Sequence, residues 1–182
     1  MHQSDIEILA KLRDEKTKEH SFAELIDLYQ ERLYWHIRKI VITHDNASDV
    51  LQNTFIRVYR GIYTFKGKSS LYTWMFRIAY NESIRFVEKN KKRTYRSIDD
   101  VNTNYLSTLK QDPYFDGNEV QMQLHYILSE VTEKQRQVFQ MKYYDELSFK
   151  QISEVTNIAE STLKSSYYTV VKIIEKKITQ EL

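Results

Sequence analysis

The segment best suited to a chemical task is residues 65–81, FKGKSSLYTWMFRIAYN. Lys66 and Lys68 flank Gly67, where the backbone can approach a phosphate closely, and the two serines that follow can cap a helix or donate to oxygen. The next residues combine the cation of Arg77 with four aromatic side chains, Tyr72, Trp74, Phe76 and Tyr80. An unstacked nucleic-acid strand requires both features, because each base stacks for roughly 1 to 3 kcal/mol and each nucleotide is anionic. The segment therefore predicts a site for single-stranded nucleic acid.

The same segment also has the spacing of a buried helix face. The positions i, i+3, i+4 and i+7 of a helix are occupied by Leu71, Trp74, Met75 and Ile78. This pattern favours a core position for Trp74 over a base-stacking one. Both roles of Trp74 stay open from the sequence alone.

Positive charge is concentrated around this segment. The formal charge of the chain is only +2, but residues 57–96 hold eleven lysines and arginines against two glutamates, a balance of +9, whereas the first 56 residues are net acidic. A run of charge is often only a solvated face. A change of sign within one block nevertheless suggests two faces with different partners, one of which is a polyanion.

Composition excludes several classes of protein. Three glycines, one proline and 41% hydrophobic residues indicate a mostly helical chain. There is no cysteine and the five histidines show no ligand spacing, so we expect no metal and no cofactor. No apolar run approaches the roughly 18 residues of a membrane span, and the first residues are charged, so we expect no membrane insertion and a cytoplasmic location.

Helix signals predict an all-α fold of two helical domains joined by a flexible linker. The first domain, residues 1–92, holds three helices: a capping box at Ser21–Glu24 opens a long one, Asn46 caps the next, and residues 71–92 form the third. Residues 93–118 are rich in polar side chains and contain the single proline, so we interpret them as the linker.

The second domain, residues 119–182, is predicted to hold three helices followed by a last one. Capping boxes begin at Thr132 and Ser148, Asn157 marks a tight turn, and the last helix opens at Ser161. That helix has one apolar face, which we expect to be buried: Leu163, Tyr167, Val170, Ile174 and Ile178. A capped short helix, a turn and a second amphipathic helix form the layout of a helix-turn-helix.

The start of the last helix carries the candidates for reading duplex DNA. Its outward residues are polar or basic: Ser161, Thr162, Lys164, Ser165, Tyr168 and Thr169. Short polar residues at a helix start can equally serve only as caps. The second domain counts eight basic and nine acidic residues, a formal charge of −1. Since phosphate neutralisation supplies most nonspecific affinity, we expect weak binding to free DNA unless another protein tethers the domain there.

Two motifs in this order resemble those of the bacterial extracytoplasmic-function (ECF, group IV) RNA polymerase sigma factors. The first is ASDVLQNTFIRVYR at residues 47–60, followed by the segment at 65–81, and the second is EKQRQVFQMKYYDELSFKQISEVTNIAESTLKSSY at residues 133–167. The resemblance covers about residues 20–92 as the family's region 2 and about 119–180 as its region 4. It implies that the protein binds core RNA polymerase and promoter DNA and helps to melt the start region, without itself being an enzyme. It also implies control by an anti-sigma factor and a monomeric state when the protein is free.

The resemblance also implies three sets of contact residues. Core polymerase would dock on Asp49, Gln52, Phe55 and Arg57, although Phe55 also belongs to an apolar stripe. The −10 element, including a base flipped from the non-template strand, would be held by Phe65, Lys66, Gly67, Lys68, Ser69, Ser70, Trp74, Arg77 and Asn81. The −35 element would be read by Ser161, Thr162, Lys164, Ser165 and Tyr168, and the linker would thread toward the RNA path.

The chain departs from the family pattern at two positions. Thr132 replaces the usual proline before EKQR, and Ser166 stands where an arginine is common. A bidentate arginine contact is worth about 1 to 3 kcal/mol of base discrimination, so we expect weaker or shape-based reading of the −35 element.

Two other functions are compatible with parts of the sequence. A stand-alone helix-turn-helix regulator would use the first domain for dimerisation or sensing and would bind duplex DNA without polymerase. A helical hydrolase would need paired carboxylates, for which Asp27, Glu31 and Asp49 are the candidates, but these show no acid–base or metal-ligand spacing on a shared face.

Overall fold

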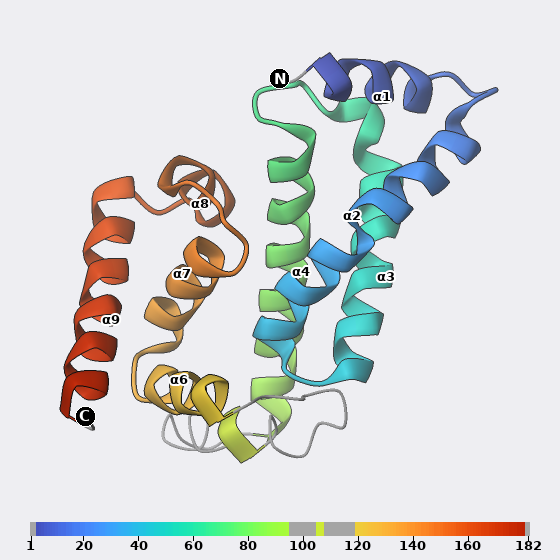
Figure 1. Cartoon of the computed structure of the whole chain (residues 1–182). Helices are drawn as coiled ribbons and strands as arrows, with labels where there is room; N and C mark the ends of the chain where they lie inside the picture. Colours follow the sequence, from blue (N-terminus) through green and yellow to red (C-terminus); the bar gives the residue numbers. More distant parts are fainter. Residues whose placement is uncertain (1–2, 95–104, 108–118, 181–182) are drawn as a thin grey trace.

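The computed structural model describes residues 3–94, 105–107 and 119–180, and in these ranges every regular element is a helix (Figure 1). The elements are α1 (Gln3–Arg13), α2 (Lys18–Val41), α3 (His44–Gly61), the 3-10 helix η1 (Ile62–Thr64), α4 (Leu71–Thr94), α6 (Glu119–Ser129), α7 (Glu133–Tyr143), α8 (Phe149–Thr156) and α9 (Glu160–Gln180). The predicted all-α fold is confirmed.

The first half of the molecule is a bundle of α2, α3 and α4, with α1 lying across one end (Figure 1). The three helices pack because each presents one apolar face to the other two. The centre of the bundle is closed to solvent by Leu25, Leu33, Ile37, Val58, Met75 and Phe76. Each such side chain contributes about 1.5 to 3 kcal/mol through burial, so the bundle is a firm support for the segment between η1 and α4.

Two predicted helix starts in the first half are wrong. Ser21 lies inside α2, where its amide donates to the carbonyl of Thr17 at 2.9 Å, because the turn at residues 14–17 starts the helix one turn earlier. Asn46 is not a cap either. Thr43 takes the extended backbone that an N-cap requires, and its hydroxyl accepts from the Asn46 amide.

The capping boxes predicted in the second half are both confirmed. The hydroxyl of Thr132 accepts from the Gln135 amide at 3.3 Å, and the Gln135 side chain accepts from the Thr132 amide at 3.1 Å. Ser148 and Gln151 exchange the same pair of hydrogen bonds. These local exchanges fix where α7 and α8 begin.

The rest of the second half follows the prediction with two corrections. Asn157 ends α8 with a φ of 61°, a left-handed conformation that asparagine tolerates, which gives the predicted turn. α9 begins at Glu160, one residue earlier than expected. The expected burial of Ile178 is wrong, since 46% of this residue is exposed and it lines an open groove beside α6.

One helix, α1, was not predicted. It lies in a charged segment, but five of its eleven residues are apolar, and two of these, Leu9 and Leu12, are buried against the bundle. These two residues are three positions apart and lie on one face of the helix.

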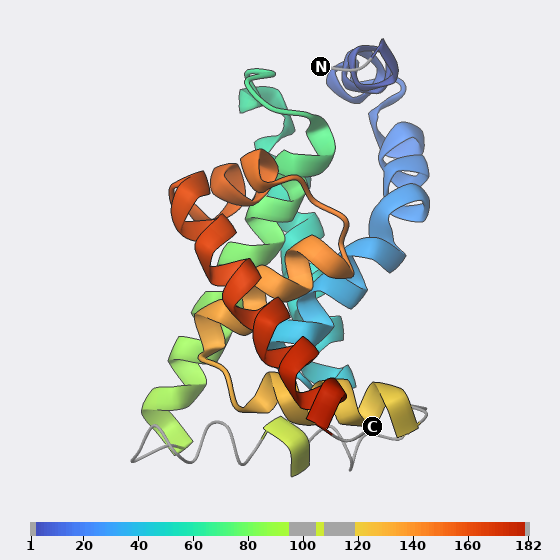
Figure 2. The ribbon, with the colours of Figure 1, turned by 60° about the vertical axis from the view of Figure 1, so that its left-hand side comes forward.

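The two halves pack against each other, with α8 against α4 and α7 against α2 (Figure 2). One continuous apolar cluster joins the bundle to residues of the second half: Val138, Met141, Leu147, Ile152, Val155 and Leu163. The two predicted domains therefore share a core. The predicted linker covers residues 93–118. The structure describes only two parts of it, residues 93–94 at the end of α4 and a helical turn at 105–107, and the rest lies outside the described part of the chain.

A buried ionic cluster also joins the halves. The carboxylate of Asp145, with 4% of its side chain exposed, accepts from His36 Nδ1 at 2.8 Å and from Lys39 Nζ at 2.5 Å. Burial acts to raise the pKa of Asp145, but the neighbouring His36 and Lys39 outweigh it and hold the pKa below its ordinary value. The cluster therefore favours the packed halves when Asp145 is ionised.

We predict that Asp145→Asn lowers the free energy of unfolding by about 3 kcal/mol at neutral pH, because it leaves the partly buried Lys39 without its counter-ion. The corresponding fall in the unfolding midpoint is about 6 to 12 °C. Since the folded pKa of Asp145 is depressed, the difference from the wild type should be complete above the ordinary carboxyl pKa near 3.8 and should disappear as the pH falls through the lower folded value.

Urea unfolding at several pH values measures this difference. The control is Asp27→Asn, which removes an exposed carboxylate from α2 and should change stability little. Equal stability of the two variants at neutral pH would contradict the role of the cluster.

Candidate nucleic-acid and polymerase interfaces

The segment between η1 and α4, residues 65–70, combines a buried root with an exposed cationic tip. Phe65 is only 5% exposed, whereas Lys66 and Lys68 are exposed on either side of Gly67. Gly67 has a φ of 67°, which a glycine adopts without the strain of a side chain. The hydroxyl of Ser70 accepts from the Thr73 amide at 3.0 Å and caps α4 as predicted. The segment, called the capture loop below, thus presents two cations from a fixed base.

Trp74 is packed at the base of the capture loop. Its ring lies 5.1 Å from the ring of Phe65, and a Cβ added to Gly61 would come within 3.1 Å of the indole. Leu71 and Met75 are fully buried, as their helical spacing predicted, and Trp74 is half-buried. The indole therefore supports the loop in this conformation while keeping part of its surface accessible.

The face of α4 that follows the capture loop makes two hydrogen bonds to the second half. Arg77 Nε donates to the carbonyl of Glu154 in α8 at 2.6 Å. Tyr80 donates to Gln137 in α7 at 3.2 Å. Asn81 remains exposed. One predicted strand-binding cation, Arg77, is thus engaged with protein here.

The predicted polymerase contacts on α3 divide into a surface set and a core residue. Asp49, Gln52 and Arg57 are exposed, and Arg57 Nε pairs with Glu82 of α4 at 2.8 Å. Phe55 is 8% exposed and its ring packs edge-on against Phe22, so it supports α3 from inside.

The sequence analysis missed an apolar member of this surface. Ile56 is an exposed hydrophobic residue of α3. Asp49, Gln52 and Ile56 occupy positions i, i+3 and i+7, so they lie on the same face of the helix. Exposed apolar side chains flanked by polar ones are common at interfaces. The sequence contained a signal for it, because Ile56 is an apolar residue on the face of α3 opposite the buried apolar stripe.

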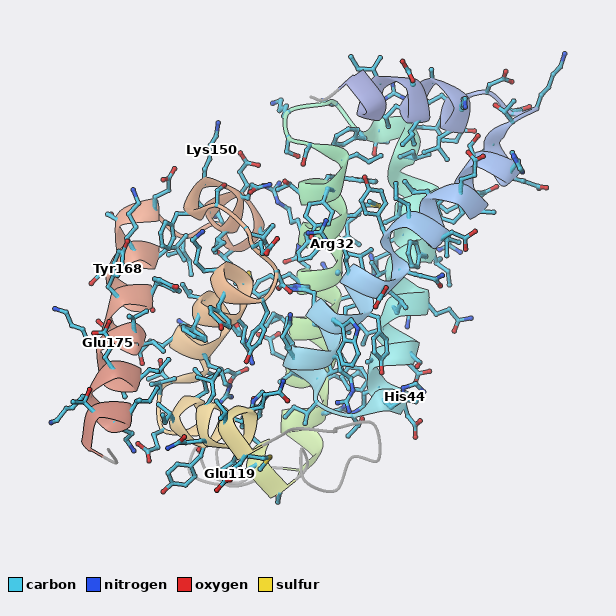
Figure 3. All side chains as sticks on the ribbon, in the orientation of Figure 1. Arg32, His44, Glu119, Lys150, Tyr168 and Glu175 are labelled. Atoms are coloured by element: carbon cyan, nitrogen blue, oxygen red, sulfur yellow. The ribbon has the colours of Figure 1, made fainter. Side chains whose placement is uncertain are left out.

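The helix-turn-helix presents its predicted DNA-reading residues to solvent. In the first three turns of α9, the exposed residues include all five candidates: Ser161, Thr162, Lys164, Ser165 and Tyr168. Figure 3 shows Tyr168 on α9 and Lys150 on α8 at the outer margin of the second half. Lys150, an exposed cation at the start of α8, was not singled out from the sequence. Ser166 is half-buried.

Neither a metal centre nor a membrane span is found among the helices and loops that the structure describes. No group of three or more His, Cys, Asp or Glu side chains is arranged to hold a metal ion in these ranges. No helix there combines the length and the hydropathy needed to cross a bilayer.

Comparison with known proteins gives the same division of the chain. Residues 25–93 match the sequence model of sigma-70 region 2, and residues 121–171 match that of sigma-70 region 4. The chain is 30% identical over 142 residues to the ECF RNA polymerase sigma factor SigM of Bacillus subtilis, covering 78% of this chain and 85% of SigM. It is 26% identical over 184 residues to the ECF RNA polymerase sigma factor SigW of the same organism, covering 95% and 98% of the two chains.

Two solved structures share the fold. CnrH in complex with the cytosolic domain of CnrY superimposes with a TM-score of 0.69 at 14% identity, covering 99% of this chain and all of that chain. The sigma factor RpoE in complex with the anti-sigma factor NepR from Bartonella quintana superimposes with a TM-score of 0.66 at 17% identity, covering 87% and 96%. With both sigma regions in order and a relative at 30% identity, the chain belongs to the ECF RNA polymerase sigma factors and acts in promoter-specific transcription initiation by RNA polymerase.

Proposed function

We propose that this chain is a group IV sigma factor that works in the cytoplasm, is not itself an enzyme, and divides its task between the two halves. In this proposal the half at residues 1–92 docks on core polymerase through α3 and holds the melted −10 element, and the half at 119–182 reads the −35 element. The observation that carries the proposal is the exposed cationic capture loop in the region 2 match together with the exposed polar start of α9 in the region 4 match.

At the −10 element the capture loop would hold displaced nucleotides. Lys66 and Lys68 would pair with phosphates, while the hydroxyls of Ser69 and Ser70 would contact a flipped base or its sugar. Flipping a base costs a few kcal/mol, which these contacts and stacking on the accessible part of Trp74 must offset. The rigid base formed by Phe65 favours this role, since a loop held in place loses little entropy on binding.

At the −35 element the first turns of α9 would enter the major groove. Thr162, Lys164 and Ser165, all exposed, would then contact base edges and phosphates. No arginine stands at Ser166, so we propose that discrimination at this element is weaker or depends on DNA shape. The formal charge of −1 in this half favours binding only when polymerase tethers it.

We infer that the halves separate when the protein binds polymerase and promoter. The −10 and −35 elements are about 25 base pairs apart, or about 85 Å of duplex, whereas a compact chain of this length has a radius of gyration of about 16 Å. The packed halves also engage Arg77 with the carbonyl of Glu154. Opening would release this cation and let each half reach its own element.

We further propose that an anti-sigma factor binds the free protein, which is otherwise a monomer. RpoE of Bartonella quintana, which shares the fold, was solved in complex with the anti-sigma factor NepR. The exposed Ile56 and the groove of α6, α7 and α9 that contains Ile178 are apolar surfaces such a partner could cover.

A stand-alone helix-turn-helix regulator is the second candidate function. It would bind duplex DNA without polymerase, whereas the sigma factor should shift little or no DNA alone. The region 2 match over residues 25–93 favours the sigma factor, because a regulator has no need of a capture loop for single strands.

Run-off transcription tests the proposal directly: core polymerase should start at promoters only when this chain is added. We predict that Asp49→Ala with Gln52→Ala lowers affinity for core polymerase by about tenfold, because interface contacts of this kind are worth about 1 kcal/mol or more. The control is Asp27→Ala, which removes an exposed carboxylate from α2. The docking assignment would be wrong if both variants bound core polymerase equally well.

The capture loop gives a second prediction, on salt dependence. With Lys66→Ala and Lys68→Ala, the slope of log affinity against log salt for holoenzyme on a forked −10 oligonucleotide should fall in magnitude by about 1.4, since each single-strand phosphate contact accounts for about 0.7. Filter binding over a range of salt concentrations measures this slope. The matched control, Lys11→Ala with Lys16→Ala, removes two exposed cations outside the loop, and an equal effect of this control would refute the assignment.

A further inference from the structure

Helix α1 lies ahead of the region 2 match, which begins at residue 25, yet it packs where the capture loop leaves the bundle (Figures 1 and 2). Leu12 is completely buried and belongs to the same apolar cluster as Ile62 and Phe65. α1 contacts both α2 and η1. The helix is therefore an integral part of this end of the bundle.

Arg13, the last residue of α1, holds the root of the loop by a direct hydrogen bond. Its Nη2 donates to the main-chain carbonyl of Phe65 at 2.6 Å, across 52 residues of sequence. A bond from a cation to a carbonyl is stronger than one between neutral groups. Because it acts on the main chain, it fixes the peptide unit between Phe65 and Lys66, and with it the direction in which the loop departs.

A second cation holds the same end of the bundle from another side. Lys18, in the first turn of α2, places its ammonium 3.8 Å from the ring centre of Tyr59 and 4.4 Å from that of Tyr63. Tyr63 lies in η1, two residues before Phe65. The Phe65 amide in turn donates to the carbonyl of Ile62 at 3.4 Å. The base of the loop is thus restrained through η1 as well as through Arg13.

We propose that Arg13 is a positioning residue for promoter capture: it sets the conformation of the capture loop without touching DNA. This inference rests on the proposed function of the loop at the −10 element. A loop already held in its binding conformation loses less entropy when it captures a flipped base, and a fixed loop distinguishes bases better than one that adapts to each. Loss of the bond should therefore affect both the lifetime of the complex and its base preference.

The test uses holoenzyme assembled from core polymerase and the full chain, bound to forked oligonucleotides that vary at each position of the −10 strand. Arg13→Ala should shorten the lifetime of the complex by about fivefold, the loss expected when about 1 kcal/mol of positioning is removed, and should flatten the base preference. Arg13→Lys should restore part of the lifetime and part of the base preference, because an ammonium can still donate to the Phe65 carbonyl. Affinity for core polymerase should stay near the wild-type value, and the unfolding midpoint should fall by no more than about 2 to 4 °C.

The matched control is Lys11→Ala, which removes an exposed cation from the same helix. If Arg13→Ala behaves like this control in lifetime and base preference, the proposal is wrong. If Arg13→Ala instead keeps its base preference and lowers the salt slope by about 0.7, Arg13 contacts a phosphate and the positioning role is likewise refuted. Failure of the wild-type holoenzyme to bind the oligonucleotides would be a failure of the proposed function itself, which separates the two cases.

Discussion

The buried carboxylate of Asp145 is the interaction on which the arrangement of the two halves depends. It follows α7 in the second half, and its hydrogen-bonding partners His36 and Lys39 both belong to α2 in the first. A buried charge is tolerated only where it is paired, whereas apolar contacts are non-directional and do not require one particular partner. We infer that the pairing selects one register for the otherwise apolar contact of α7 and α8 with the bundle.

This register decides which functional surfaces are free. The exposed side of α3, the tip of the capture loop and the first turns of α9 all face solvent, while Arg77 on α4 is engaged with α8. The packed halves therefore leave exposed the surfaces that we propose to read DNA, while they hold Arg77 by a hydrogen bond that opening would break. The low net charge of the region 4 half supports the proposal that the protein needs polymerase for stable contact with DNA.

Local capping signals predicted the helix starts correctly in the second half but not in the first, where Thr17 and Thr43, not Ser21 and Asn46, precede α2 and α3. The capping boxes at Thr132 and Ser148 formed as expected, and the exposed residues of α9 follow from helical spacing. The contact between the halves could not be predicted, because His36 and Asp145 are 109 residues apart and meet only in the finished fold. For Phe55 the resemblance implied a polymerase contact, but its apolar pattern already indicated the core, where the structure places it.

The central claim is that the halves are packed in the free protein and separate on polymerase. The chain has no cysteine, so Glu24→Cys on α2 and Lys176→Cys on α9 provide two unique sites for fluorescent labels at exposed positions in the two halves. Energy transfer between the labels should report a single short distance for the free protein and a longer one after core polymerase and promoter DNA are added. An unchanged distance in a complex that initiates transcription would contradict the account.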